Sequence, residues 1–252
     1  RRLLADDKAA ELRYGENPHQ AAAVYGDQEE FIHCFHGKAL SYNNYMDIDS
    51  ALRLMTDFVG DDPTCAIFKH NVPCGVTTAS NLSEAYELAF QTDTVSPFGG
   101  IIIVNKELDA DTAEAINRIF SEVILAPSYT PKALELLQQK KNRRLITIKK
   151  WPHSKDQLAY RSIFGGVLAQ QADPGYSEDE TNNWEVVTKR CPSDEEWEDL
   201  TFGWKVVKHV GSNGIVYSKD RRTLGIGTGQ PSRVDSSRFA IAKAESENLE
   251  LQ

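Results

Sequence analysis

"CAIFKHNVPCG", residues 65–75, places a short apolar run directly before Lys69 and His70 and then before Pro73 and Gly75. A run of this length bounded by turn residues is typical of a buried strand, and Pro73 and Gly75 predict the turn that follows it. In α/β sheets, ligands gather beyond the carboxyl ends of strands, because loop amides and helix N-termini meet there. We therefore expect Lys69 and His70 at the ligand-facing edge of a sheet.

Two interpretations of the Lys69-His70 pair stay open from this stretch alone. Histidine titrates near neutral pH and can take a proton during a reaction, while an adjacent ammonium can stabilise an oxyanion. Alternatively, the strand ends in ordinary polar residues, with Lys69 extending to solvent and His70 capping a carbonyl group. The first interpretation predicts a catalytic pair and the second a structural strand end.

The rest of the chain alternates short β-branched runs with longer stretches of helical period, which predicts an α/β fold. The expected strands are Cys65–Phe68, Gly100–Val104, Val123–Ala126, Leu145–Ile148, Gly166–Ala169, Ile215–Ser218 and Leu224–Ile226. The expected helices are Met46–Phe58, Leu82–Phe90, Thr112–Phe120, Pro131–Lys141, Asp194–Val210 and Ser232–Ser246. A boundary near residue 150 divides the chain into two expected lobes, residues 1–150 and 151–252.

Composition excludes several classes of function. The 252 residues include 37 acidic and 28 basic side chains, and a net charge of -9 argues against a broad nucleic-acid or membrane surface. Four scattered cysteines with no C-x-x-C pair indicate neither a zinc knuckle nor a disulfide framework, which fits a reducing cytosol. The chain opens on Arg1-Arg2 without an initiator methionine or a signal-peptide pattern, so we expect a piece of a longer protein.

Three further stretches contain side chains suited to a polar ligand. In "LRYGENPHQ" (12–20), Arg13 could fork onto a phosphate beside Tyr14, or could be a solvated arginine in a turn. In "SYNNYMD" (41–47), amide and hydroxyl groups crowd before a helix, where Asn44 or a neighbour could simply cap it. In "TVSPFGGIIIVN" (94–105), Gly99 would let backbone approach a ligand closely, or would only permit an unusual turn.

The stretch with the most glycine, serine and arginine is residues 208–238, "KHVGSNGIVYSKDRRTLGIGTGQPSRVDSSR". A helix start at Ser232-Arg233 would offer backbone N–H groups and an arginine to an anion. Gly225-x-Gly227 continues to Gln230, so the spacing is neither a dinucleotide fingerprint nor a P-loop. A hairpin with a flexible glycine connection is the alternative.

Cys74 invites two other hypotheses, both of which the sequence disfavours. Pro73-Cys74 matches half of a zinc deaminase signature, but no second cysteine follows at the required spacing and no H-x-E precedes it. A nucleophilic Cys74 would need electropositive surroundings, of which Lys69 alone is evident.

Taken in order, the motifs closely resemble one family. "LRYGENPHQ", "GKALSYNN", "FKHNVPCG", "PFGGIIIVN", "EVILAPSY", "KKNRRLI", "VVTKR", "WKVVKHVGSNGIVY" and "GIGTGQPSRVDS" follow one another as they do in the aminoimidazole carboxamide ribonucleotide (AICAR) transformylase family, a part of bifunctional purine biosynthesis enzymes. The resemblance extends from about residue 11 to about residue 244, nearly the whole chain.

The resemblance implies an enzyme, fold and partners. The activity would be formyl transfer from 10-formyltetrahydrofolate to the 5-amino group of AICAR in the biosynthesis of IMP. The fold would be two cytidine-deaminase-like lobes with mixed sheets flanked by helices. The family is a cytoplasmic, intertwined homodimer with sites at the subunit interface. It needs no metal for catalysis, and a bound monovalent cation is left open.

The same resemblance assigns roles to individual residues. His70 matches the family's general base, Lys69 the group that stabilises charge in the transition state, and Asn213 a catalytic, nucleotide-binding position. Further nucleotide-binding positions are Arg13, Tyr14, Gly99 and Arg233, and Val234 falls at a folate-contacting position. Glu122 stands where family members often carry Asp, so its carboxylate would reach one methylene further.

The chain also departs from the family. Members continue past its end with a segment that reads "ASDAFFPFRD" and an arginine-bearing tail, and a cyclohydrolase domain precedes "LRYGENPHQ". The second lobe is therefore expected to be incomplete and the 252-residue piece alone inactive. The competing interpretation is a truncated homologue that binds the nucleotide without catalysis. A zinc deaminase is a third, disfavoured interpretation.

Overall fold

The computed structural model describes residues 6–152, 158–173, 177 and 183–251. Its centre is an eight-stranded mixed sheet in the order β11-β12-β5-β4-β6-β7-β8-β3. The pairs β6-β7 and β7-β8 are parallel and the other neighbours antiparallel. The strands of this sheet are β3 (Ile32–His36), β4 (Thr64–Lys69), β5 (Val72–Thr78), β6 (Gly100–Val104), β7 (Ser121–Ala126), β8 (Arg144–Ile148), β11 (Ile215–Lys219) and β12 (Arg222–Gly227). The predicted α/β class is confirmed.

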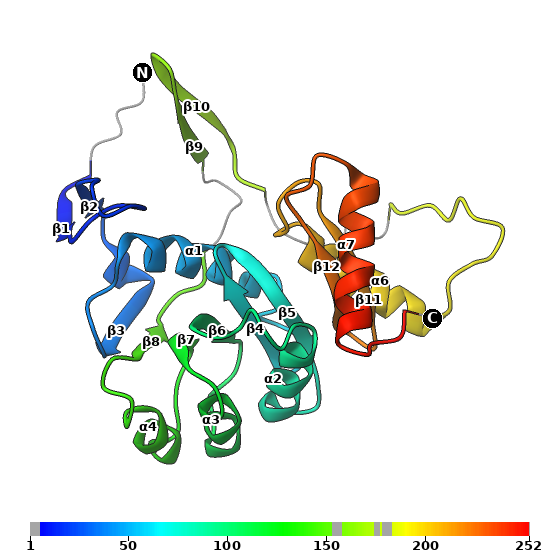
Figure 1. Ribbon diagram of the computed structural model, residues 1–252, viewed down its shortest axis with the longest axis horizontal. Coiled ribbons are helices and arrows are strands. Elements are labelled where there is room, and N and C mark those ends of the chain that lie inside the picture. The colour runs from blue at the N-terminus through cyan, green and yellow to red at the C-terminus, as the bar shows by residue number, and fades with distance from the viewer. Residues whose placement is uncertain (1–5, 153–157, 174–176, 178–182, 252) are drawn as a thin grey trace.

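Helices cover both faces of the sheet (Figure 1). They are α1 (Tyr42–Thr56), α2 (Leu82–Gln91), α3 (Ala110–Asn117), α4 (Pro131–Leu137), α6 (Asp194–Val207) and α7 (Arg233–Ser246). In strand β4, the residues between Thr64 and Lys69 are all apolar, and the packing of the strand explains this. Ala66 and Phe68 belong to the core cluster that includes α1 and α6, whereas Cys65 and Ile67 belong to the cluster that includes α2, α3 and α4. A central strand buried on both faces has no polar face to alternate with its apolar one.

Side-chain caps set where the helices begin. Ser41 and Asn44 form a reciprocal capping box, so α1 starts at Tyr42, four residues before the expected Met46. Asp109 caps α3 by accepting the backbone N–H of Thr112, so this helix starts at Ala110, two residues before the expected Thr112. The Thr130-Pro131 start of α4 is confirmed. The capping role considered for Asn44 is therefore real.

The predicted turn at Pro73 and Gly75 is wrong. The chain turns two residues earlier, at His70 and Asn71, whose φ angles are 52° and 63°, and β5 then runs through both predicted turn residues. Positive φ at both central positions is typical of the type I′ turn, whose backbone twist matches the twist of the two strands in a two-residue hairpin. Pro73 is tolerated because the register with β4 shifts by a bulge at this point.

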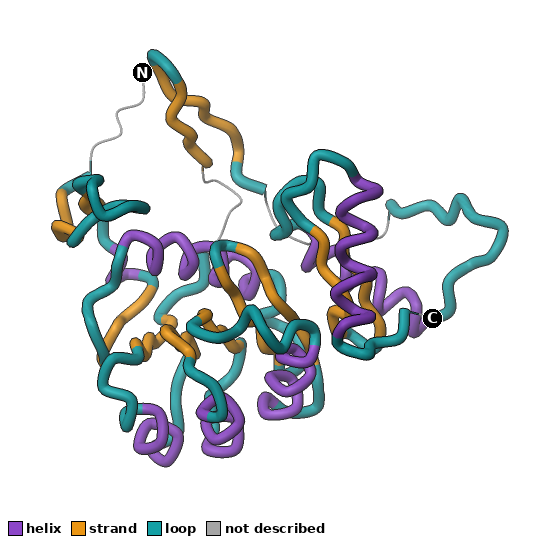
Figure 2. The backbone as a smooth tube through the Cα atoms, viewed as in Figure 1, coloured by secondary structure: helices purple, strands orange, loops and turns teal. Residues whose placement is uncertain are grey.

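Two small antiparallel sheets lie outside the large one. The first joins β1 (Lys8–Leu12) to β2 (Ala22–Tyr25), and the second joins β9 (Leu158–Ile163) to β10 (Gly166–Gln171). Figure 2 shows the β9–β10 hairpin standing away from the eight-stranded sheet. Apolar side chains on it are open to solvent, including Phe164, Leu168 and Val167.

The second half of the chain adds β11 and β12 to the sheet of the first half, through the pairing of β12 with β5. The lobe division near residue 150 remains a prediction. Across the described ranges, no helix is both long and apolar enough to cross a membrane.

Candidate active site

Lys69 and His70 lie where β4 meets its hairpin turn, as the sequence predicted. The ammonium of Lys69 donates a hydrogen bond to the carbonyl oxygen of Phe98, at 2.6 Å. The loop approaches this closely because Gly99 has φ of +70°, and a Cβ at Gly99 would lie 3.3 Å from Lys69 Nζ. Gly99 also donates its backbone N–H to the carbonyl of Phe120, at 2.7 Å. Gly99 thus brings the 94–99 loop against Lys69.

His70 lines two hollows, which have no other lining residue in common. The first, about 460 Å³, is formed with residues from the 16–17 loop and from the first turns of α1, including Asp47. The second, about 250 Å³, is formed with Lys69, with the start of β5 and with Thr228, Phe239 and Lys243 from the second half of the chain. A ligand bound in either hollow would therefore lie next to His70.

Asp47 is a polar residue at this site that sequence reasoning missed. One carboxylate oxygen accepts the backbone N–H of Asn71 at 2.6 Å. Burial raises the pKa of the Asp47 carboxyl, while the hydrogen bond from Asn71 and the charges of His70 and Lys69 oppose that rise. The stretch "SYNNYMD" contained Asp47, but only the amides and hydroxyls in it were considered as ligands.

Glu122 points its carboxylate at polar groups on two other elements. It accepts hydrogen bonds from Arg144 at 2.8 Å and from the Asn44 amide at 3.3 Å. Arg144 is buried and also donates to the carbonyl of Ala39. The glutamate is therefore part of a charged network between α1, β7 and β8.

Arg13 and Tyr14 precede the residues that line the first hollow. The Arg13 guanidinium lies 5.7 Å from the centre of the Tyr14 ring, and the arginine is exposed. Glu16 and Asn17, a few residues further along this loop, share that hollow with His70. The structure thus places the two predicted residues on a loop that borders the His70 hollow.

Asn213, Arg233 and Val234 lie together at a different place. The side-chain amide of Asn213 donates to the carbonyls of Gln230 at 2.9 Å and Pro231 at 3.0 Å, which fixes the loop before α7. Arg233 and Val234 form the exposed first turn of α7. None of the three lines either hollow beside His70 in the part of the chain described here.

Asp93 and Lys243 connect α7 to the loop that contacts Lys69. The Lys243 ammonium lies 2.6 Å from the Asp93 carboxylate, which also accepts the backbone N–H groups of Val95 and Ser96 at 3.0 and 2.9 Å. Burial opposes ionisation of Asp93, but these hydrogen bonds together hold the pKa of its carboxyl below the usual range. A buried carboxylate thereby organises residues 93–96.

Cys74 lines the second hollow but is a poor nucleophile. Burial raises the pKa of its thiol to about 12, so the reactive thiolate is scarce at neutral pH. Among the described residues, no three His, Cys, Asp or Glu side chains lie together in a way that could hold a metal ion.

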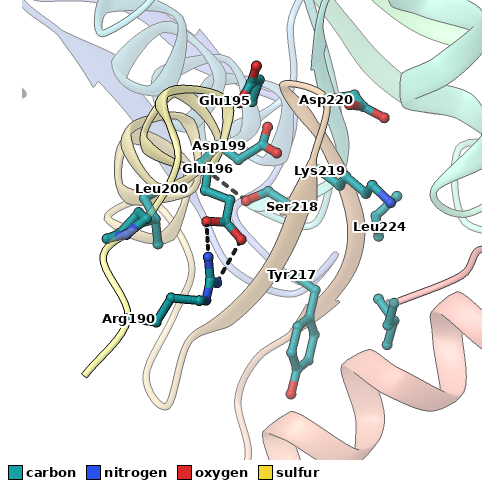
Figure 3. Close-up of a pocket in the computed structure, with 12 residues that line it drawn as sticks. Arg190, Glu195, Glu196, Asp199, Leu200, Tyr217, Ser218, Lys219, Asp220 and Leu224 are labelled. Atoms are coloured by element: carbon teal, nitrogen blue, oxygen red, sulfur yellow. Dashed lines mark hydrogen bonds and ion pairs between the residues drawn. The ribbon is translucent and has the colours of Figure 1, made fainter. Parts of the chain in front are cut away.

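A third hollow of about 440 Å³ lies between α6 and the β11–β12 hairpin (Figure 3). The Arg190 guanidinium donates two hydrogen bonds to the Glu196 carboxylate there, with N···O distances of 2.6 and 2.8 Å. The Ser218 hydroxyl donates to the backbone carbonyl of Asp199. Because Arg190 is already paired with a carboxylate, it is less suited to hold an anionic ligand than the groups around His70.

At the His70 site, an imidazole and an ammonium stand on consecutive residues beside open space. This pairing suits a reaction in which a nucleophile loses a proton while an oxyanion forms nearby.

Comparison with known proteins matches residues 2–243 to the AICARFT/IMPCHase bienzyme family. The bifunctional purine biosynthesis protein PurH of Chloroflexus aurantiacus is 51% identical over 250 residues, which covers 99% of this chain and 48% of that protein. The PurH proteins of Chlorobium phaeobacteroides (strain BS1) and Chlorobium luteolum are each 47% identical over 253 residues, 97% of this chain and 48% of theirs. The chain spans about half the length of these relatives. It belongs to the AICARFT/IMPCHase bienzyme family.

Proposed function

We propose that this chain carries the formyl transfer activity of its family, in which 10-formyltetrahydrofolate donates a formyl group to the 5-amino group of AICAR. The observation that carries the proposal is the placement of Lys69 and His70 on consecutive residues at the open turn of β4 and β5. The matched stretch of the family, residues 2–243, contains both residues.

The chemistry explains why these two residue types stand together. An aromatic amine conjugated to a carboxamide is a weak nucleophile, so His70 removes its proton as the nitrogen attacks the formyl carbon. The carbonyl oxygen becomes an oxyanion, and Lys69 supplies the positive donor that stabilises it. Collapse of this intermediate breaks the bond to the folate nitrogen, which takes the proton back from the His70 imidazolium as it leaves, so that His70 returns to its neutral form. Lysine has three donors, so the bond to Phe98 leaves two for the oxyanion.

We assign the nucleotide to the first hollow and to its border. Arg13 would hold the phosphate and Tyr14 the nucleotide from the loop that continues into Glu16 and Asn17. Gly99 gives the nucleotide close access to backbone. Glu122 is held by Arg144 and Asn44, so its role would be to accept a hydrogen bond at a fixed position.

Asn213, Arg233 and Val234 would complete a site at a subunit interface. Asn213 and Arg233 would contact the nucleotide and Val234 the folate. All three lie apart from the His70 hollows within one chain, so we propose that a homodimer brings such groups together. The exposed apolar side chains of the β9–β10 hairpin support a partner surface of this kind. We place this enzyme in the cytoplasm.

The experiment is a formyl transfer assay on the complete product of the gene that encodes this chain, with AICAR and 10-formyltetrahydrofolate. Formation of the formylated nucleotide supports the proposal, and its absence with folded protein contradicts it. Calorimetry with each ligand separately distinguishes the alternative, because a homologue without catalysis binds the nucleotide but not the folate.

A further inference from the structure

The β11–β12 hairpin repeats the β4–β5 hairpin in its backbone. In the first, Ile67 pairs with Gly75 and the register then shifts by a bulge; in the second, Tyr217 pairs with Gly225 and the same shift follows. Each hairpin packs on the helix that precedes it and on the helix that follows it. The chain therefore contains two copies of one unit, α1-β4-β5-α2 and α6-β11-β12-α7.

Gly75 and Gly225 are both required for the same reason, which is the close approach of a helix to the strand. A Cβ at Gly75 would lie 2.0 Å from the carbonyl oxygen of Ala89 on α2, and a Cβ at Gly225 would lie 2.3 Å from the carbonyl oxygen of Ala240 on α7. Both positions need glycine, because no side chain fits between strand and helix at that distance.

The turns also match. His70 and Asn71 have φ of 52° and 63°, and Asp220 and Arg221 have φ of 53° and 51°. These four non-glycine residues thus have left-handed backbone, which is strained for a residue with a Cβ and persists only where the surroundings hold it.

An aspartate on the preceding helix holds each turn. Asp47 on α1 accepts the backbone N–H of Asn71 at 2.6 Å, and Asp199 on α6 accepts the backbone N–H of Arg221 at 2.8 Å. This aspartate-to-backbone hydrogen bond occurs in both copies, although the side chains of the two turns differ. We therefore attribute the fixed backbone conformation of the turn to this hydrogen bond.

The two copies differ in the side chain that the turn exposes to a neighbouring hollow. The first presents His70 between two hollows, and Asp47 lines one of them with it. The second presents Asp220, visible with Asp199 in Figure 3, at the hollow between α6 and its hairpin. We infer that Asp47 is the positioning residue for His70: by accepting the Asn71 N–H it holds the left-handed turn that aims the imidazole. This inference rests on the proposed formyl transfer for its catalytic consequence.

The first test compares Asp47→Ala with the matched control Asp199→Ala in the complete gene product. Asp47→Ala should lower kcat about tenfold to a hundredfold, the range that a misplaced catalytic group loses, with KM for either substrate changed less than about threefold. Asp199→Ala should stay within about threefold of wild type. Equal losses of kcat in the two variants would overturn the proposal, because they would indicate general destabilisation.

Two further measurements separate positioning from other roles. Asp47→Asn keeps an acceptor oxygen and should recover kcat to within about fivefold of wild type, so a larger loss would contradict a role through the hydrogen bond. In a His70→Ala background, Asp47→Ala should cause no additional loss of kcat, since both act as one unit. An additional tenfold loss would contradict action through His70.

Amide hydrogen exchange tests the positioning without any turnover. The Asn71 amide should exchange at least about tenfold faster in Asp47→Ala and the Arg221 amide likewise in Asp199→Ala, each without a change at the other turn. An unchanged Asn71 amide would overturn the proposal. If the wild-type protein transfers no formyl group, the proposed function fails and this measurement alone decides the role of Asp47. If Asp47→Ala does not fold, Asp47→Asn takes its place. A loss of kcat above about fivefold in that variant, with the Asn71 amide still protected, would overturn the proposal.

Discussion

The ammonium of Lys243, on the last helix, lies 2.6 Å from the carboxylate of Asp93, on the loop that leads to the Lys69 contact at Phe98. This pair joins the second half of the chain to the loop that contacts Lys69 in the first half. A substitution of Lys243 should therefore affect the structure of residues 93–96, although Lys243 and Asp93 lie 150 positions apart in the sequence.

The Asp93-Lys243 pair predicts a pH-dependent contribution to stability. The pKa of Asp93 is lowered in the folded protein, so the stabilisation is present above the unfolded value near 4 and is lost as pH falls through the folded value. Lys243→Met should lower the free energy of unfolding by about 1 to 3 kcal/mol at pH 7. The difference from wild type should shrink as pH drops below about 4. Urea unfolding at a series of pH values checks this.

Arg238→Met is the matched control, because Arg238 pairs with Asp235 on the exposed face of the same helix. Its effect should stay within about 0.5 kcal/mol at every pH. A loss from Lys243→Met that is constant down to pH 3 would contradict the coupling to Asp93.

Gly75 predicts a large loss of stability on substitution. In Gly75→Ala the new Cβ would meet the carbonyl oxygen of Ala89 at 2.0 Å, so strand or helix must shift. The free energy of unfolding should fall by about 2 to 4 kcal/mol, the range for severe overpacking. Gly60→Ala, where nothing lies within 4 Å of the new Cβ, should change it by less than about 1 kcal/mol. Equal effects in chemical denaturation would refute the packing argument.

The four cysteines should differ in reactivity. Cys65 is fully buried and burial raises the pKa of the Cys74 thiol to about 12, whereas Cys191 is exposed. A thiol reagent at pH 7 to 8 should modify one cysteine quickly in the native protein and four after denaturation. Cys191→Ser should abolish the fast phase. Fast labelling that survives this change would place a reactive thiol elsewhere.

The β9–β10 hairpin should mediate association if the proposed homodimer forms. Phe164, in the turn of the hairpin, is completely exposed, and Leu168, on β10, is 56% exposed. Among the described residues, β9 and β10 pair with no other strand. Replacing both with lysine should shift the mass in sedimentation velocity toward the monomer. Val187→Lys, at a residue 87% exposed outside the hairpin, should leave the mass unchanged. An unaltered dimer in the hairpin variant would exclude the hairpin from the interface.

Sequence predicted strands β4, β6, β7 and β8 because each contains a short apolar run, as expected of strands that are buried on both faces. Strand β5 was missed since Pro73 and Gly75 are ordinarily turn residues. A bulge accommodates the proline, and the helix packed against the strand demands the glycine.

The candidate site was predicted less completely than the strands. Lys69, His70 and Gly99 could be recognised because local sequence places them at a strand end or a turn, and the structure brings them together. Asp47 could not, since its partner is a backbone N–H that follows from a turn 24 residues away. The repeat of the hairpin also stays hidden in the sequence, because what the two copies share is chiefly backbone.

The central claim is that His70 takes the proton from the attacking amine. Its most direct test is the formyl transfer rate of His70→Ala in the complete gene product at saturating AICAR and 10-formyltetrahydrofolate. The account predicts a fall in kcat of about 10²- to 10⁴-fold, the contribution of a positioned general base, with an unchanged unfolding midpoint. A variant that folds and keeps near-normal kcat would contradict it.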